Sequence, residues 1–196
     1  MFWVISVYFN IRNTLPKSGT FLLGHPAYIY IPFPYVYNVK NSVQFVKDLS
    51  DIPFDPNLKL PSLDISNMYA NIPTEELFNI IDIMCDKNNI EDTLKLEITE
   101  ISMLIIAQNY FKFGDRTYLQ KNGLAMGAPT SSIMSEIYLQ PIESTKNYDI
   151  LRNSKTEGYF RYVDDILLVY KDNLTNIEGI LNLFNNISPG LVFTLE

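Results

Sequence analysis

Two apolar runs meet at a pair of adjacent aspartates, and this stretch constrains the fold more than any other part of the chain. Residues 159–163 and 166–170 are rich in aromatic and β-branched side chains, and Asp164 and Asp165 stand between them. Runs of this composition are typical of strands, so we predict a β-hairpin with the two aspartates at its tip. Tight hairpin turns usually contain glycine or asparagine, because they need positive φ. The aspartate pair is therefore locally unfavourable.

The aspartate pair has two interpretations. Neighbouring carboxylates repel one another unless a divalent cation lies between them, and oxygen ligands of this kind suit Mg²⁺. The other interpretation is a solvated acidic turn without a ligand. Buried flanking strands would hold both carboxylates rigidly, which favours the metal site. A third carboxylate brought near by the fold would decide between the two.

A candidate for this third carboxylate stands at the end of another predicted strand. The short strand ends near Asp64, a tight connection follows, and a helix is predicted from Thr74, its N-cap, to Asn88. The expected buried stripe of this helix is Leu77, Ile80, Ile81 and Met84. A carboxylate at a strand end can be presented to a ligand, but an aspartate that only shapes the loop explains Asp64 as well.

A second hairpin is predicted around Gly114-Asp115, after a helix from about Glu97 to Tyr110 with Ile98, Ile101, Leu104 and Ile105 on its buried face. Residues 111–120 alternate as paired strands do. This hairpin is expected to place three basic residues close together, in the densest basic cluster of the chain: Lys112, Arg116 and Lys121. A nucleic-acid contact and a solvated hairpin face explain the cluster equally well.

A loop of small residues precedes a further predicted helix, which runs through Glu143. Residues 123–132 contain two glycines and a proline before a Ser/Thr-rich helix start. Small residues let a bulky ligand approach the backbone, and the N–H groups of a helix start can bind it. Without further context, an ordinary loop with a helix cap is the simpler interpretation.

The three motifs stand in the order found in the palm of a reverse transcriptase. Asp64 with Tyr69 is similar to motif A, residues 123–132 to motif B, and residues 162–165 to motif C. Finer details, such as Asn71-Ile72-Pro73, resemble Penelope-like retroelements, and the resemblance covers roughly residues 39–196. It implies an α+β fold, a polymerase palm made of an antiparallel sheet covered by helices, with partial fingers and the thumb missing.

The resemblance implies an RNA-directed DNA polymerase, a nucleotidyltransferase of a retrotransposon. Asp64, Asp164 and Asp165, with the backbone carbonyl of Ile65, would hold two Mg²⁺ ions about 3.5–4 Å apart. One ion would activate the primer 3′-hydroxyl and the other would bind the triphosphate and its leaving group. The implied partners are an RNA template, a DNA primer and deoxynucleoside triphosphates.

The resemblance also assigns contacts to the nucleotide and the nucleic acid. Tyr69 stands where the family places an aromatic ring that clashes with a ribose 2′-hydroxyl, which favours deoxynucleotides; plain core packing is the alternative. Met126 and Gly127 are implied nucleotide contacts, and relatives in this group share Met126 where many reverse transcriptases have glutamine. The implied nucleic-acid contacts are the basic residues of the second hairpin, Lys112, Arg116 and Lys121.

The expected domain division follows from the same resemblance. Residues 1–60, interrupted by six prolines, are expected to be a degraded or partial fingers segment, and residues 61–196 the palm. Residues 87–122 are compatible with either the palm or the fingers. The family's fingers carry a basic pair for the triphosphate, yet residues 19–38 contain neither Lys nor Arg. The chain is also expected to lack a thumb and a terminal endonuclease.

The overall charge opposes a nucleic-acid function. The net charge of −7 has the wrong sign for a surface that binds phosphates as a whole, although a local basic groove and bound metal are compatible with it. The alternative function is therefore a catalytically inactive, polymerase-derived fragment that binds nucleic acid or protein. The sequence leaves the oligomeric state open.

The absence of a visible targeting signal and the single cysteine and histidine give little information about function. No apolar run approaches the roughly 18–20 residues that span a bilayer, and no secretion or other targeting signal is seen. We expect an intracellular protein without a membrane partner, and the resemblance is compatible with the nucleus. The single cysteine, Cys85, is predicted to be buried filler, and the single histidine, His25, receives no role.

Overall fold

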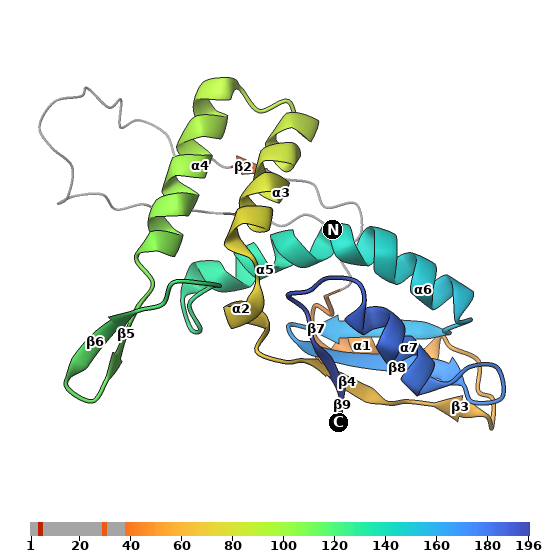
Figure 1. Ribbon diagram of the computed structural model, residues 1–196. Helices are drawn as coiled ribbons and strands as arrows, with labels where there is room; N and C mark the ends of the chain where they lie inside the picture. Colours follow the sequence, from red (N-terminus) through yellow and green to blue (C-terminus); the bar gives the residue numbers. More distant parts are fainter. Residues whose placement is uncertain (1–3, 6–28, 31–37) are drawn as a thin grey trace, which may run out of the picture. The chain divides into compact units, whose positions relative to one another are not determined.

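The structure is a computed structural model that describes residues 4–5, 29–30 and 38–196 and divides into two compact units (Figure 1). In the first unit, Met1–Pro34, β1 (Val4–Ile5) pairs antiparallel with β2 (Ile29–Tyr30). His25 and most of the stretch without basic residues lie outside the described residues. The second unit, Tyr35–Glu196, contains every predicted motif.

An antiparallel sheet forms the centre of the second unit. Its order is β7 (Gly158–Tyr162), β8 (Asp165–Lys171), β4 (Ser62–Ile65) and β9 (Phe193–Leu195). The short strand β3 (Leu58–Lys59) pairs with the far end of β8. Because β4 pairs with both β8 and β9, its last residues are held on both sides.

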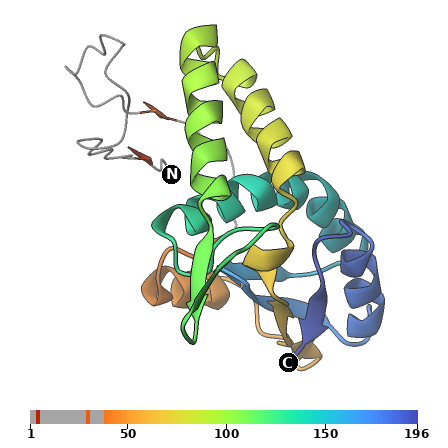
Figure 2. The same ribbon diagram turned by 60° about the vertical axis from the view of Figure 1, so that its left-hand side comes forward.

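Helices lie on both faces of this sheet (Figures 1 and 2). One face is covered by α5 (Pro129–Ile142), its continuation η1 (Glu143–Asn147) and α6 (Tyr148–Asn153), and by α7 (Ile177–Asn185). On the other face, α1 (Ser42–Ser50) packs Phe45 edge-on against Phe160, with ring centroids 5.4 Å apart. The short α2 (Met68–Asn71) leads from β4 into α3 (Thr74–Lys87), and α3 pairs with α4 (Asp92–Ala107).

The alternation of the strands separates a fully covered face from a partly open one. Leu63 of β4 lies opposite Ile166 of β8, and both are at most 1% exposed. Phe184 of α7 is also fully buried and packs on Phe193 of β9, with ring centroids 5.2 Å apart. The core therefore lies between this face and α5, η1 and α7. Asp64 and Asp165 point to the other face.

The second hairpin is separate from the main sheet. β5 (Tyr110–Phe113) pairs with β6 (Arg116–Leu119) across Gly114-Asp115, as the sequence predicted. It follows α4 and projects away from the helices, and all eight strand residues are exposed (Figures 1 and 2). The described residues contain no helix long and apolar enough to cross a membrane.

Several local predictions need correction. The tip of the first hairpin is Val163-Asp164, because Asp165 already pairs with Tyr162 at the start of β8. The helix predicted for residues 97–110 spans Asp92–Ala107, and Leu104 on its expected buried face is 59% exposed. Since α4 rests mainly on α3, little of its surface is covered.

The predicted helix from Thr74 is confirmed, with a different cap. Pro73 occupies the N-cap position, so Thr74 is the first helical residue rather than the cap. Cys85 is 1% exposed and joins Leu77 and Ile81 in the buried face, which confirms that this cysteine is buried. Burial raises the pKa of the Cys85 thiol. A buried, protonated thiol has little reactivity.

Candidate catalytic site

Segments that are distant in the sequence meet at one end of the sheet. In the register of β4 and β8, Asp64 lies directly opposite Asp165. Opposite residues of an antiparallel pair point to the same face, with Cβ atoms about 4.5–5.5 Å apart. The amide of Ile65 donates to the carbonyl oxygen of Asp164 at 3.0 Å. The backbone thus brings together all four residues predicted as metal ligands.

The carboxylates influence one another. Desolvation raises the pKa of Asp165 above its ordinary value, and the negative charges of Asp164, Glu196 and Asp64 raise it further. Glu196 was not expected at the site; its side chain accepts a hydrogen bond from the Ser62 hydroxyl at 3.1 Å. This accumulation of negative charge at one strand end favours a cation.

Two hydroxyl groups flank Asp64 and were also missed by the sequence analysis. The Ser66 hydroxyl donates to Asp64 Oδ2 at 3.3 Å and lies 3.1 Å from the hydroxyl oxygen of Thr194. Thr194 is opposite Asp64 in the β4–β9 register. Only this pairing, which the sequence does not reveal, brings Thr194 to the site.

The donor groups suit a hard divalent cation, since carboxylate and carbonyl oxygens are the ligands that Mg²⁺ prefers. The side chains do not converge on one point, however. Among the described residues, no group of three or more His, Cys, Asp or Glu side chains lies close enough together to hold a metal ion. The backbone placement of Asp64, Ile65, Asp164 and Asp165 and the chemistry of their oxygen atoms fit a metal site.

The turn between β7 and β8 has an unusual backbone. Val163 has a φ of 59°, in the left-handed region, whereas Asp164 does not have positive φ. Positive φ at the first central residue is the pattern of a type II′ turn, where glycine is usual. A β-branched residue is strongly disfavoured there, so surrounding contacts must hold the turn in place.

The connection after Asp64 is joined to the small-residue loop. The amide of Leu124 donates to the carbonyl of Tyr69 at 2.7 Å. Gly123 has a φ of +74°, and a Cβ atom there would lie 2.2 Å from the carbonyl oxygen of Ala70. Only glycine allows this approach. The predicted motifs A and B are therefore in direct backbone contact.

Tyr69 lies next to the aspartate turn. Its side chain is half-buried, and burial raises the pKa of its hydroxyl, with the charges of Asp164 and Glu136 acting in the same direction. A hydrogen bond with Ser135 of α5 lowers it. Tyr69 thus lies among the turn, α5 and the loop rather than in the apolar core.

A family profile for reverse transcriptase (RNA-dependent DNA polymerase) matches residues 56–189, which include Asp64, the small-residue loop and the aspartate turn. The chain belongs to the reverse transcriptase family. No curated protein sequence matches this chain.

The reverse transcriptase chain is also similar in fold to solved telomerases. The apo telomerase from Candida tropicalis aligns with a TM-score of 0.61 and 15% identity, over 81% of this chain and 32% of that one. The same enzyme truncated from its C-terminal domain gives 0.58 and 16%, over 81% and 34%. Telomerase from Candida albicans in complex with a TWJ fragment of telomeric RNA gives 0.57 and 17%, over 82% and 32%.

The chain therefore spans about a third of the length of these structures. At this level of identity the likeness concerns the fold. It confirms the predicted fold class, an α+β arrangement with an antiparallel sheet covered by helices, consistent with a partial polymerase palm.

The residues predicted to contact the nucleotide are accessible. Met126 is 79% exposed. Gly127 has a φ of +86°, and no atom lies within 4 Å of the position that a Cβ would take. Both residues precede α5, whose first residue is Pro129. A ligand can thus reach the backbone of this loop.

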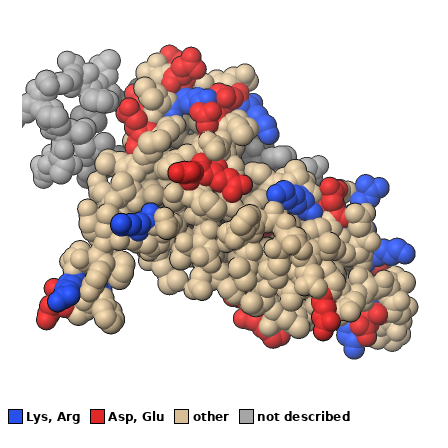
Figure 3. Space-filling view, viewed as in Figure 1, with Lys and Arg blue, Asp and Glu red and all other residues tan. Residues whose placement is uncertain are grey.

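The predicted basic cluster is not a single surface. In the β5–β6 register, Lys112 lies opposite Thr117 and Arg116 opposite Phe113, so the two basic side chains point to opposite faces. Lys121 follows β6 and is exposed. On the face of the molecule shown in Figure 3, basic and acidic side chains are interspersed, without an extended basic groove.

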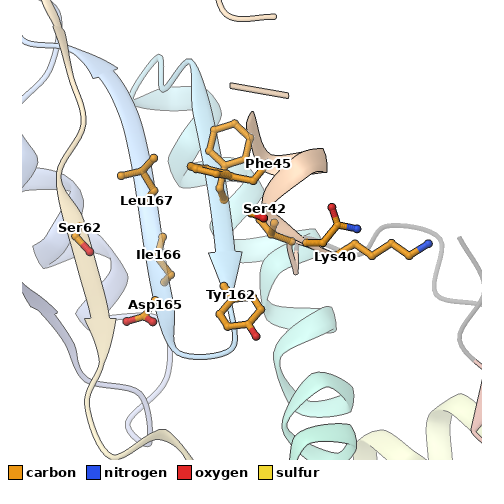
Figure 4. A pocket seen from close by; sticks show the side chains of 11 residues that line it. Lys40, Ser42, Phe45, Ser62, Tyr162, Asp165, Ile166 and Leu167 are labelled. Atoms are coloured by element: carbon orange, nitrogen blue, oxygen red, sulfur yellow. The ribbon is translucent and has the colours of Figure 1, made fainter. Parts of the chain in front are cut away.

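A pocket of about 540 Å³ lies beside Asp165 on the partly open face of the sheet (Figure 4). Phe45 and Phe160 line this pocket, and Figure 4 shows Tyr162 and Asp165 at the end nearest the aspartate turn. Lys40 also lines it. The pocket beside the candidate site therefore has mostly apolar walls and two charged side chains, Lys40 and Asp165.

Proposed function

We propose that this chain is the palm of an RNA-directed DNA polymerase from a Penelope-like retrotransposon, with residues 1–60 as a degraded or partial fingers segment and residues 61–196 as the palm, of which residues 87–122 could contribute to the fingers. The observation that supports it most is the pairing of Asp64 with Asp165, next to the bond between Ile65 and Asp164, in a chain of the reverse transcriptase family. Two elements far apart in sequence supply carboxylates to one strand end.

The proposed chemistry is two-metal nucleotidyl transfer. Asp64, Asp164 and Asp165, with the carbonyl of Ile65, would hold two Mg²⁺ ions. Bound there, the ions would lower the pKa of the primer 3′-hydroxyl and stabilise the charge on the phosphates. The chain's own contribution is positional, because the β4–β8 register holds the carboxylates on one face.

The small-residue loop and Tyr69 would receive the deoxynucleoside triphosphate. Exposed Met126 and unobstructed Gly127 allow the nucleotide to approach, while the half-buried ring of Tyr69 lies close to Asp164. A ring in this place would exclude a ribose 2′-hydroxyl. Tyr69→Ala should raise ribonucleotide incorporation relative to deoxynucleotide incorporation, and an unchanged ratio would make Tyr69 a packing residue.

The β5–β6 hairpin is the proposed contact for the RNA template. One face carries Arg116 together with Phe111, Phe113 and Tyr118, and the other carries Lys112. Aromatic rings beside a cation suit single-stranded nucleic acid, since bases stack on the rings and phosphates pair with the charge. Lys121 would add a phosphate contact next to the hairpin.

Primer extension tests the proposal. The chain in excess is incubated with a DNA primer on an RNA template, deoxynucleotides and Mg²⁺, in parallel with Asp164→Asn. We expect at most short, metal-dependent extension that the variant loses, because positioning and charge stabilisation also need basic groups on the triphosphate and a surface that holds the duplex. Extension that persists in Asp164→Asn would contradict the proposal.

The alternative is a polymerase-derived chain that binds nucleic acid or protein without turnover. The net charge of −7 and the absence of an extended basic groove on the face in Figure 3 favour it. Mn²⁺ binding followed by electron paramagnetic resonance separates the two functions. Template binding with neither extension nor Mn²⁺ binding that depends on Asp164 would support the alternative.

A further inference from the structure

Arg161 of β7 is the largest fully buried side chain of the described residues, with 0% exposure. A guanidinium has five N–H donors, and here each has an acceptor. Nε and Nη2 donate to Glu143 at 2.5 and 2.9 Å, and Nη1 and Nη2 donate to Glu136 at 2.7 and 3.0 Å. The remaining Nη1 donor reaches the carbonyl oxygen of Val163 at 3.0 Å.

Filling a core with this ion-pair network costs more free energy than filling it with apolar side chains. Removing charges from water costs several kcal/mol per ion, and apolar residues of similar volume often stabilise a fold as well or better. Burial opposes the positive charge, but the hydrogen bonds and charges of Glu143 and Glu136 raise the pKa of Arg161 well above its ordinary value. The guanidinium therefore keeps its positive charge, and what distinguishes the network is the fixed geometry of its hydrogen bonds.

That geometry fixes the aspartate turn. The acceptor on the turn is the carbonyl of Val163, the residue with positive φ. The Val163 amide donates to Asn38 Oδ1 at 3.4 Å, and Asn38 Nδ2 donates to Glu136 at 2.9 Å. Both backbone polar groups of Val163 are therefore held by the same network. Two hydrogen bonds from directed partners can sustain a disfavoured backbone conformation.

We propose that Arg161, braced by Glu136, Glu143 and Asn38, is a positioning residue that holds the Val163-Asp164 turn so that Asp164 and Asp165 face Asp64. The side chain of Arg161 is on the covered face of the sheet and acts through the backbone of Val163. The metal-binding consequence rests on the proposed function. The positioning itself concerns the turn and can be measured without metal.

The test compares Arg161→Lys with the wild-type chain. Lysine keeps the charge but has three donors on a single nitrogen, so it cannot hold two carboxylates and a carbonyl in a fixed fork. Amide hydrogen exchange of Ile65 reports the turn, because this amide donates to Asp164 and touches no mutated residue. We expect its exchange to accelerate about tenfold or more, with Mn²⁺ affinity reduced about tenfold, as for other residues that orient ligands.

Two controls separate positioning from general destabilisation. Arg152→Lys makes the same substitution at an exposed arginine of α6. Ile81→Val or Ile81→Ala in α3, chosen to match the Tm of Arg161→Lys, destabilises the fold away from the network. Neither control should change Ile65 exchange beyond the global effect. If Arg161→Lys does not fold, Asn38→Ala is the second variant. It removes only the hydrogen bonds of Asn38 to the Val163 amide and to Glu136, and it should accelerate Ile65 exchange by a smaller factor.

The readouts distinguish the two proposals. Ile65 exchange equal to that of the Tm-matched control would overturn the positioning role. Faster Ile65 exchange supports it whether or not metal binds. If the wild-type chain and Asp164→Asn bind Mn²⁺ equally weakly, the proposed metal site fails while the positioning role still stands on the exchange data.

Discussion

The two hairpins of the chain are both antiparallel pairs, but their surroundings are opposite. In β7–β8, Arg161, Leu168 and Val169 are at most 1% exposed, and helices lie on both faces of the sheet. In β5–β6, every strand residue is exposed, and Phe113 is 76% exposed. The continuous apolar strands of the first hairpin were expected to be buried, whereas the alternation in residues 111–120 was compatible with a solvated hairpin, and the structure agrees with both.

Their turns differ in the same way. The exposed hairpin turns at Gly114, with a φ of +61° that glycine adopts without strain. The buried hairpin turns at Val163, with a φ of 59° that valine disfavours. An isolated two-stranded hairpin is marginally stable in water and needs a relaxed turn. A packed hairpin can hold a strained turn, and this one presents the aspartates.

The largest expected difference between the hairpins is in stability. Leu168→Ala removes a fully buried side chain and should lower the free energy of unfolding by about 2–5 kcal/mol. Phe111→Ala in the exposed hairpin should change it by less than about 0.5 kcal/mol. Urea denaturation followed by circular dichroism measures both. Equal losses would mean that something covers β5–β6 in solution.

A smaller effect should appear in RNA binding and only in the exposed hairpin. Tyr118 stacks on Phe111, with ring centroids 5.5 Å apart. Tyr118→Ala should weaken the binding of single-stranded RNA by about 1–3 kcal/mol, the value of one stacked base. Fluorescence anisotropy with labelled RNA measures this, and Tyr110→Ala on the opposite face is the matched control. Equal losses in both variants would refute a face-specific template contact.

Exchanging the turn residues should produce changes of about 1 kcal/mol with opposite signs. Gly114→Val places a β-branched residue at positive φ and should destabilise the chain. Val163→Gly relieves the same strain and should stabilise it slightly, while loosening the aspartate turn. Thermal denaturation gives the signs, and Ile65 amide exchange reports the loosening. A destabilising Val163→Gly would show that the valine side chain matters more than its backbone strain.

The smallest expected effect is the pH dependence introduced by Asp165. The pKa of Asp165 is raised above the ordinary 3.8, so the folded chain favours the protonated carboxyl. The contribution of this group to stability is therefore complete below pH 3.8 and is lost as the pH rises through the raised pKa. Without divalent ions, Asp165→Asn should therefore raise the Tm at neutral pH by about 1 °C, since solvent screens this exposed group, and should have no benefit at pH 3. Asp115→Asn in the exposed turn is the control. A benefit that is the same at both pH values would rule out carboxylate repulsion as its cause.

Local sequence predicted the elements that depend on short-range chemistry. Two runs of aromatic and β-branched residues identified the first hairpin, alternating residues identified the second, and helical spacing identified α3. The small-residue loop was singled out because glycines let a ligand approach the backbone, whereas the structure shows that Gly123 is needed for the close approach of the Ala70 backbone. The boundaries of the elements were less accurate. The turn of the first hairpin was predicted one residue late, and α4 was predicted to start five residues late and to end three residues late. Element ends depend on pairing and capping by neighbouring segments.

Only the tertiary structure decided what those elements contact. Asp64 faces Asp165 because β4 pairs beside β8, and Lys112 is separated from Arg116 because neighbouring register positions alternate between faces. The bond from Asn38 to Glu136 joins residues 98 positions apart, so no local pattern could reveal it. Arg161 reads in the sequence as a polar residue within a strand; its burial follows from the two carboxylates that α5 and η1 bring to it. Strand and helix periodicity are properties of neighbouring residues, whereas the pairing of buried charges depends on which distant segments the packed chain places side by side.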